Sequence, residues 1–160
     1  MGDYNSKQAI IWDIDGTLSN PEHRSIYVNC EKKDRDFDKF RELAYLDTPK
    51  IVEIGICNGN HLNGFKVIFC TGRLESDREM TIKWLKDHGV AAAHAVVPLD
   101  LRMRPDERQF EKDYVVKSDI LDEILNEGYT VHMVYDDRDQ VVHMYRARGL
   151  TCHQVQNGNY

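Results

Sequence analysis

The sequence lacks paired cysteines and long apolar segments. Its four cysteines are widely spaced, and no two of them form a Cys-x-x-Cys pair. A zinc site or a disulfide framework is therefore not expected, and a reducing, cytoplasmic setting is the natural expectation. The first residues are polar, and no apolar run approaches the roughly 20 residues that a membrane-spanning helix needs, so we expect no membrane contact. The cysteines are Cys30, Cys57, Cys70 and Cys152.

Positive charge is also scarce. The formal net charge is -6 in a chain of 160 residues. Proteins that coat nucleic acid are usually basic, because binding to a polyphosphate is driven by the release of counterions. Any contact with nucleic acid is therefore expected to be local, at a strand end or a single nucleotide. No glycine is followed by lysine, so the sequence has no G-x-x-x-x-G-K-[ST] and no ATP-binding loop of that kind is expected.

Short apolar runs alternate along the chain with amphipathic stretches. This alternation is typical of an α/β fold, in which helices cover both faces of a central parallel sheet. The expected strands are 8–14, 65–70, 93–98, 131–135 and 150–155. One expected helix follows a capping box formed by Ser76 and Glu79, and two more span 114–127 and 140–148. We expect a single domain covering 1–160.

The segment 19–64 is longer than a simple connection between two strands. It is rich in charge from Glu31 to Asp38, and it ends in the loop-like stretch GICNGNHLNG. We interpret 19–64 as a small helical cap inserted into the domain, with helices at 37–46 and 49–56 followed by a loop. Such an insertion is a natural place for substrate selection.

Polar motifs follow three of the expected strands, and a lysine begins the helix that precedes the fourth. Ligands bind beyond the carboxyl ends of parallel strands, so we expect these motifs to converge. Each motif alone is also compatible with an ordinary turn or helix cap, but their joint occurrence in this order favours a catalytic site. The motifs are DIDGT (Asp13, Asp15, Gly16, Thr17), TGR (Thr71, Gly72, Arg73), Lys117, and DDRD (Asp136, Asp137, Arg138, Asp139).

The chemistry of these groups is complementary. Asp13 and Asp136 can supply oxygen ligands to Mg²⁺, and Asp13 can attack phosphorus as a nucleophile. Asp15 is two residues further along an extended segment, so its side chain is expected on the same side. It can act as general acid and base once neighbouring carboxylates and burial raise its pKa. Thr71 can bond a phosphoryl oxygen. Lys117 lies on the apolar stripe of its helix, so it needs an anionic partner, and the aspartates are the obvious one.

These motifs resemble the four-motif pattern of the haloacid dehalogenase (HAD) superfamily. More narrowly, the chain is similar to the 3′-phosphatase domains of bacteriophage polynucleotide kinases, most densely in IIWDIDGTL, VIFCTGR, DYVVKSDIL and the stretch 134–160. The resemblance implies a Rossmann-like HAD fold and Mg²⁺-dependent hydrolysis of phosphomonoesters through an aspartyl-phosphate. It implies a nucleophile (Asp13), a general acid/base (Asp15), phosphate-binding residues (Thr71, Lys117), substrate-binding residues (Arg24, Gly72, Arg73) and metal ligands (Asp13, Asp15, Asp136, Asp137).

The resemblance also implies that the substrate is a 3′-phosphate on a DNA or RNA end, and the missing ATP-binding loop implies that 5′-kinase activity is absent. Two alternatives remain open. One is a phosphatase of nucleoside monophosphates or another small phosphomonoester, and the other is a non-catalytic phosphoacceptor receiver module. A strand near its end could contact two basic sets, one in the expected cap (Lys32, Lys33, Arg35) and one ahead of the Lys117 helix (Arg102, Arg104, Arg108).

Overall fold

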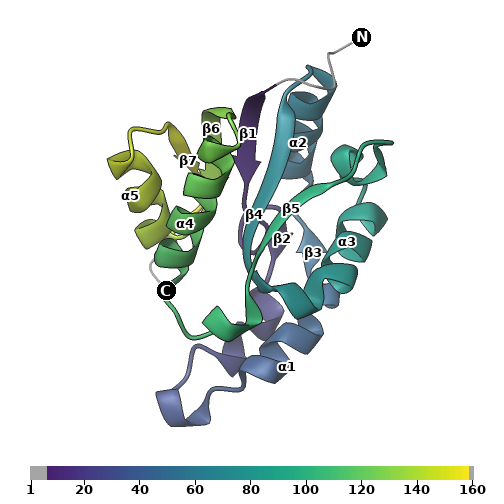
Figure 1. Ribbon diagram of the computed structural model, residues 1–160. Helices are drawn as coiled ribbons and strands as arrows, with labels where there is room; N and C mark the ends of the chain where they lie inside the picture. The colour runs from purple at the N-terminus through teal and green to yellow at the C-terminus, as the bar shows by residue number, and fades with distance from the viewer. Residues whose placement is uncertain (1–6, 159–160) are drawn as a thin grey trace.

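The computed structural model describes residues 7–158 and contains a five-stranded sheet in the order β5-β4-β1-β6-β7 (Figure 1). Every neighbouring pair in this sheet is parallel. The expected α/β fold with a central parallel sheet is therefore confirmed. The strands are β1 (Gln8–Trp12), β4 (Lys66–Leu74), β5 (Asp100–Arg104), β6 (Thr130–Asp136) and β7 (Cys152–Gln154).

Four helices cover the two faces of the sheet: α2 (Ile51–Leu62), α3 (Arg78–Asp87), α4 (Asp113–Asn126) and α5 (Asp139–Ala147). Successive side chains of a strand point to opposite faces, and β1 shows this directly. Ile10 packs in one core cluster with residues of α2 and α3, whereas Ile11 packs in a second cluster with residues of α4 and α5. Both faces of β1 are buried, which explains why its sequence is a continuous apolar run.

The segment between β1 and α2 stands apart from the main sheet. It contains a two-stranded antiparallel ribbon of β2 (Ser19–Asn20) and β3 (Thr48–Pro49). Between these strands lie the helix α1 (Phe37–Glu42) and the 3-10 helices η1 (Glu22–Tyr27), η2 (Lys32–Asp34) and η3 (Leu43–Leu46). Figure 1 shows α1 beyond the end of the sheet at which β1 and β4 terminate.

Helix α2 differs from the expectation for its segment. The predicted helix ended at residue 56 and was followed by a loop, whereas α2 continues to Leu62. Glycine and asparagine have low helix propensity, so the composition of 55–60 favoured a loop. Tertiary contacts override that preference, because Ile54 and Cys57 are buried against the sheet and Trp12 Nε1 donates to Asn60 Oδ1 at 3.1 Å. Helix α2 therefore belongs to the layer that covers the sheet.

Two further expectations were wrong. Residues 93–98 do not form a strand: a 3-10 helix, η5 (Ala91–His94), lies there and Val96 is fully exposed. The strand falls instead at β5, whose arginines made it look polar. Ser76 is not the cap of α3, because its hydroxyl donates to Asp106 Oδ1 and the helix begins after Asp77. The remaining 3-10 helices are η4 (Glu75–Asp77) and η6 (Asp106–Arg108). No helix within residues 7–158 is long and apolar enough to cross a membrane.

Candidate active site

Three buried aspartates meet at the carboxyl ends of β1 and β6. Asp13 directly follows β1, Asp136 is the last residue of β6, and Asp137 follows it. The two strands are neighbours, and Asp13 N donates to Tyr135 O at 3.0 Å, which brings the two ends together. Asp13, Asp136 and Asp137 each offer one carboxylate oxygen within 4.8 Å of the others. We call these three residues the carboxylate cluster.

Lys117 reaches the carboxylate cluster from α4. Its side chain is buried, and Nζ donates to Asp13 Oδ1 and to Asp136 Oδ2, at 2.8 Å in each case. It also lies 3.4 Å from Asp113 Oδ2, one helical turn earlier. The lysine therefore lies where the apolar stripe of its helix had indicated, facing the aspartates and not the solvent.

The charges of this group do not balance. Burial raises the pKa of the Asp13 carboxyl well above its usual value, and Asp136 and Asp137 raise it further, while Lys117 opposes them only in part. Burial alone would lower the pKa of Lys117, but the surrounding carboxylates outweigh burial and raise that pKa well above its usual value. Lys117 therefore offsets only part of the unfavourable charge around Asp13. The hard oxygens of the carboxylates fit a divalent cation, which would supply further positive charge.

Asp15 lies outside the carboxylate cluster and is held by arginines. Arg24 NH2 donates to Asp15 Oδ1 at 2.6 Å, and Arg73 NH2 donates to the same oxygen at 2.7 Å. The hydroxyl oxygen of Ser19 lies 3.2 Å from the same carboxylate oxygen. The structure thus brings Arg24 and Arg73 to one carboxylate, although they are distant in the sequence. The side chain of Asp15 is not among the cluster's ligand oxygens.

The pKa of Asp15 differs from the expectation. Sequence reasoning required neighbouring carboxylates and burial to raise it. Burial does act in that direction, but Arg73 and Arg24 outweigh it and hold the pKa of Asp15 well below its usual value. The expectation of a raised pKa was wrong for this state of the protein, because the charges that face Asp15 are guanidinium groups and not carboxylates.

Asp47, which no sequence motif singles out, is buried at the centre of this charged group. It accepts hydrogen bonds from Arg24 Nε at 2.7 Å and Arg24 NH2 at 2.6 Å. The Ser19 hydroxyl donates to it at 2.9 Å, and Arg73 NH2 at 3.3 Å. Asp47 lies immediately before β3 in a segment of low motif content, so only the folded chain shows that it holds both arginines.

Thr71 and Gly72 lie within β4, the strand that pairs with β1. Thr71 is buried, and its hydroxyl oxygen accepts a hydrogen bond from Arg73 N at 3.2 Å. A Cβ at Gly72 would come within 2.7 Å of Asp113 Oδ1, so only glycine leaves room for that carboxylate. Asp113 was not predicted. The signal for it was its position four residues before Lys117, which places both side chains on one face of a helix.

The second basic set that was expected to contact a nucleic-acid strand forms ion pairs within the chain. Arg102 pairs with Asp100 and Glu127, and Arg108 pairs with Glu111 and Asp119. Arg104 is buried, and its NH2 donates to Asp113 Oδ1 at 2.7 Å. Arg104 is therefore not available to a phosphate, whereas Arg102 and Arg108 lie in surface ion pairs, and their contact with a nucleic-acid strand stays a prediction. The set in 32–35 remains exposed on the segment between β2 and β3.

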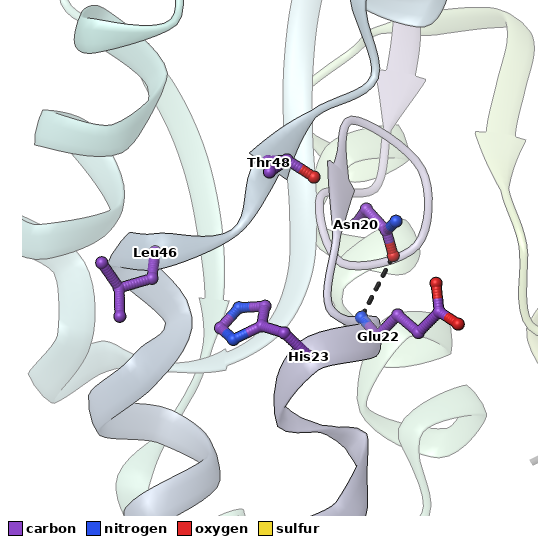
Figure 2. Close-up of a pocket in the computed structure, with 5 residues that line it drawn as sticks. All are labelled: Asn20, Glu22, His23, Leu46 and Thr48. Atoms are coloured by element: carbon purple, nitrogen blue, oxygen red, sulfur yellow. Dashed lines mark hydrogen bonds between the residues drawn. The ribbon is translucent and has the colours of Figure 1, made fainter.

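A cavity of about 370 Å³ lies beside the β2–β3 ribbon and is lined by Asn20, Glu22, His23, Leu46 and Thr48 (Figure 2). Asn20 pairs with Thr48 across the two strands. Alternation along a strand places the Asn20 side chain opposite that of Ser19, which faces Asp15. His23 lines the cavity and also contacts the charged group around Asp15, because its Nε2 lies 2.9 Å from Asp47 Oδ1.

The parallel sheet, the carboxylate cluster and its buried lysine define a phosphatase of the HAD type. The model of the family described as "Polynucleotide kinase PNKP phosphatase domain" matches residues 7–160, so the chain belongs to that family. The protein is accordingly a phosphoric monoester hydrolase, and phosphatases of this type generally depend on a metal ion.

Similar proteins include larger ones. A chain in the structure of the Pnkp1/Rnl/Hen1 RNA repair complex matches with a TM-score of 0.78 and 28% sequence identity. The match covers 100% of this chain but only 46% of the larger chain. A protein of Autographa californica nuclear polyhedrosis virus, named as a bifunctional polynucleotide kinase/RNA ligase, is 28% identical over 142 residues, and the match spans 18% of its length. The class C acid phosphatase from Bacillus anthracis shares the fold, with a TM-score of 0.67 at 16% identity. The match covers 98% of this chain and 69% of the acid phosphatase chain.

Proposed function

We propose that the protein is a Mg²⁺-dependent polynucleotide 3′-phosphatase that acts through an aspartyl-phosphate on Asp13 and has no 5′-kinase activity. The observation that carries this proposal is the convergence of the carboxylate cluster, Lys117 and the arginine-held Asp15 at one end of the sheet. Family membership supports the chemistry, and the names of similar proteins support polynucleotides as the substrate class.

Asp13 is the proposed nucleophile. Its carboxylate oxygen attacks phosphorus, the bond from phosphorus to the leaving oxygen breaks, and the phosphoryl group is then held on Asp13. Lys117 bonds the carboxylate at Oδ1, which orients it for attack. Thr17, whose hydroxyl donates to Asp13 Oδ2 at 3.3 Å, fixes the other oxygen. Water then attacks the phosphorus, the bond to Asp13 breaks, and inorganic phosphate leaves.

Asp15 is the proposed general acid and base, and its pKa has to rise before it can donate a proton. Arg24 and Arg73 hold that pKa low in the free protein. A phosphate dianion competes for the same guanidinium groups, because arginine binds phosphate and carboxylate by the same paired hydrogen bonds. Substrate binding thereby releases Asp15, which takes up a proton from solvent, gives it to the leaving oxygen as the bond to phosphorus breaks, and afterwards takes a proton from the attacking water. Proton transfer of this kind typically contributes about 10²–10⁴-fold in rate.

Asp13, Asp136 and Asp137 are the residues that would hold Mg²⁺ by their carboxylates. The ion would neutralise charge on the phosphoryl oxygens and lower the pKa of the crowded carboxylates. The side chain of Asp15 lies apart from these three, so its proposed contribution to the metal site is limited to its main chain.

A phosphorylated strand end fits better than a long polynucleotide. The arginines of β5 and η6 are engaged in ion pairs, so the described residues offer no continuous basic track on that side. The net charge of -6 also opposes extended contact with a polyanion. The guanidinium groups of Arg24 and Arg73 are concentrated at the site itself, which favours one terminal phosphate.

A substrate panel under identical Mg²⁺ conditions tests this function. We expect kcat/KM for a 3′-phosphorylated oligonucleotide to exceed kcat/KM for the 5′-phosphorylated oligonucleotide of the same sequence and for nucleoside 5′-monophosphates. Equal or reversed values would replace the proposal with a small-molecule phosphatase. A single turnover followed by a stable phosphoprotein, with no further phosphate release, would indicate a receiver module instead.

A further inference from the structure

From the last residue of β7 onward, the chain packs against two residues of the carboxylate cluster, Asp136 and Asp137. We call residues 154–158 the C-terminal strap. Gln154 pairs with Asp136 in the sheet, and Val155 N donates to Asp136 O at 3.1 Å. Gln154 Nε2 donates to the main-chain oxygen of Asp137 at 2.9 Å and to Asp139 Oδ1 at 2.6 Å. The strap is therefore fastened to the loop that holds two of the three carboxylates.

Asp137 is confined by main chain on two sides. A Cβ at Gly158, in the strap, would lie 2.2 Å from the main-chain oxygen of Asp137. A Cβ at Gly16, in the loop after β1, would lie 2.1 Å from Asp137 Oδ2, and the φ of Gly16 is +84°. No other residue type fits at either position without moving Asp137. The position of this carboxylate thus depends on the β1 loop and on the strap together.

Gln156 connects these parts through its side chain. Its Nε2 donates to Asp137 Oδ2 at 3.3 Å, and its Oε1 accepts from Lys50 Nζ at 3.0 Å. Lys50 Nζ also donates to Gly16 O at 3.0 Å. An ammonium group only donates and a carboxylate only accepts, so a single orientation of the Gln156 amide satisfies both neighbours. Lys50 precedes α2, and it thereby fixes the amide that bonds Asp137.

We propose that Gln156, oriented by Lys50, is a positioning residue that holds the Asp137 carboxylate in place for the divalent cation. The proposal rests on the cation site of the proposed function. Partners that orient a metal ligand typically change metal affinity by about 10–100-fold when they are removed. Gln156 reaches the carboxylate cluster through Asp137, so its loss should weaken cation binding more than it slows the step at phosphorus.

Substitution Gln156→Met tests the proposal, because it keeps the length of the side chain and removes both hydrogen bonds. Gln140→Met, at an exposed position on α5, is the matched control. Binding of Mg²⁺ and of Mn²⁺ to the intact protein is measured by isothermal titration calorimetry. We expect Gln156→Met to bind about ten-fold more weakly than wild type and the control to be unchanged. We expect kcat at saturating Mg²⁺ and the Tm of the EDTA-treated protein to stay close to wild type.

Lys50→Met provides a second variant that leaves Gln156 in place and removes its anchor. We expect Lys50→Met to lose affinity for the cation, but less than Gln156→Met does. Such a loss supports the proposed relay even if Gln156→Met fails to fold. Wild-type affinity in both variants would overturn the positioning role while leaving the cation site intact. Absence of Mg²⁺ and Mn²⁺ binding to wild type would overturn the cation site itself, and the positioning role with it.

Discussion

Asp15 and Asp47 share the same two arginines. Arg24 NH2 lies 2.6 Å from an oxygen of each carboxylate, and Arg73 NH2 lies 2.7 Å from Asp15 Oδ1 and 3.3 Å from Asp47 Oδ2. The side chain of Asp47 is fully buried, whereas that of Asp15 is 26% exposed. Asp47 is thus the fixed anchor of both guanidinium groups, and Asp15 is the partner that an incoming phosphate can displace.

Asp47→Asn removes the charge of this anchor while keeping the size of the side chain. Loss of one partner from a buried ion pair leaves uncompensated charge, so we expect the free energy of unfolding to fall by about 3 kcal/mol. We also expect KM to rise, because both arginines lose their support. Urea denaturation and steady-state kinetics measure the two effects. Asp38→Asn is the control, since Asp38 is exposed, and equal stability of the two variants would contradict the anchor role.

The low pKa of Asp15 predicts how stability depends on pH. The folded protein holds Asp15 ionised below the pKa of about 4 that the unfolded chain has, so the unfolded state binds more protons in acid. The contribution of Asp15 is therefore complete above that value and is lost as the pH falls below it. We expect the stability difference between wild type and Asp15→Asn to be largest near neutral pH and to shrink on acidification. Urea denaturation across a pH series measures this difference in unfolding free energy. A difference that grows in acid would refute the stabilising role of ionised Asp15.

Lys117→Met leaves Asp13, Asp113 and Asp136 without the ammonium group that they share. We expect the free energy of unfolding of the EDTA-treated protein to fall by about 3–5 kcal/mol, and phosphatase activity to be lost. Lys83→Met is the matched control, because Lys83 is exposed in a surface ion pair and its loss should cost less than about 1 kcal/mol. Chemical denaturation in EDTA compares the losses of unfolding free energy in the two variants. Similar losses would show that Lys117 is not essential to charge balance.

The sequence predicted the elements that carry a clear apolar pattern. Strands β1, β4 and β6 and helices α4 and α5 lie close to their expected positions, because their apolar patterns are long and uninterrupted. Strand β5 was missed because it lies at the edge of the sheet and carries Arg102 and Arg104. Those arginines are compensated by ion pairs with residues distant in the sequence, and local patterns do not reveal such pairing.

The site was predictable to the extent that it is built from motifs at strand ends. Sequence order placed Asp13, Lys117 and Asp136 together, because parallel strands end at one edge of the sheet. The partners of Asp15 were not predictable in the same way. Asp47 lies in a segment without a motif, and its contact with Arg24 depends on how the β2–β3 ribbon folds back. The pKa of Asp15 follows from those contacts, so its direction could not be read from spacing.

Asp13→Asn separates the chemical role of Asp13 from its effect on stability. The amide is a poor nucleophile, so we expect phosphatase turnover to fall by at least about 10³-fold, since the covalent step is lost. The amide oxygen can still accept the hydrogen bond from Lys117, while the repulsion from Asp136 and Asp137 that raises the pKa of Asp13 disappears. We therefore expect the EDTA-treated variant to have a higher Tm than EDTA-treated wild type, as groups crowded for function often cost stability.

Phosphate release and thermal denaturation measure the two effects of Asp13→Asn, with Asp34→Asn as an exposed control. Substantial remaining turnover would exclude Asp13 as the nucleophile, and a lower Tm would show that its charge is stabilising in the metal-free protein.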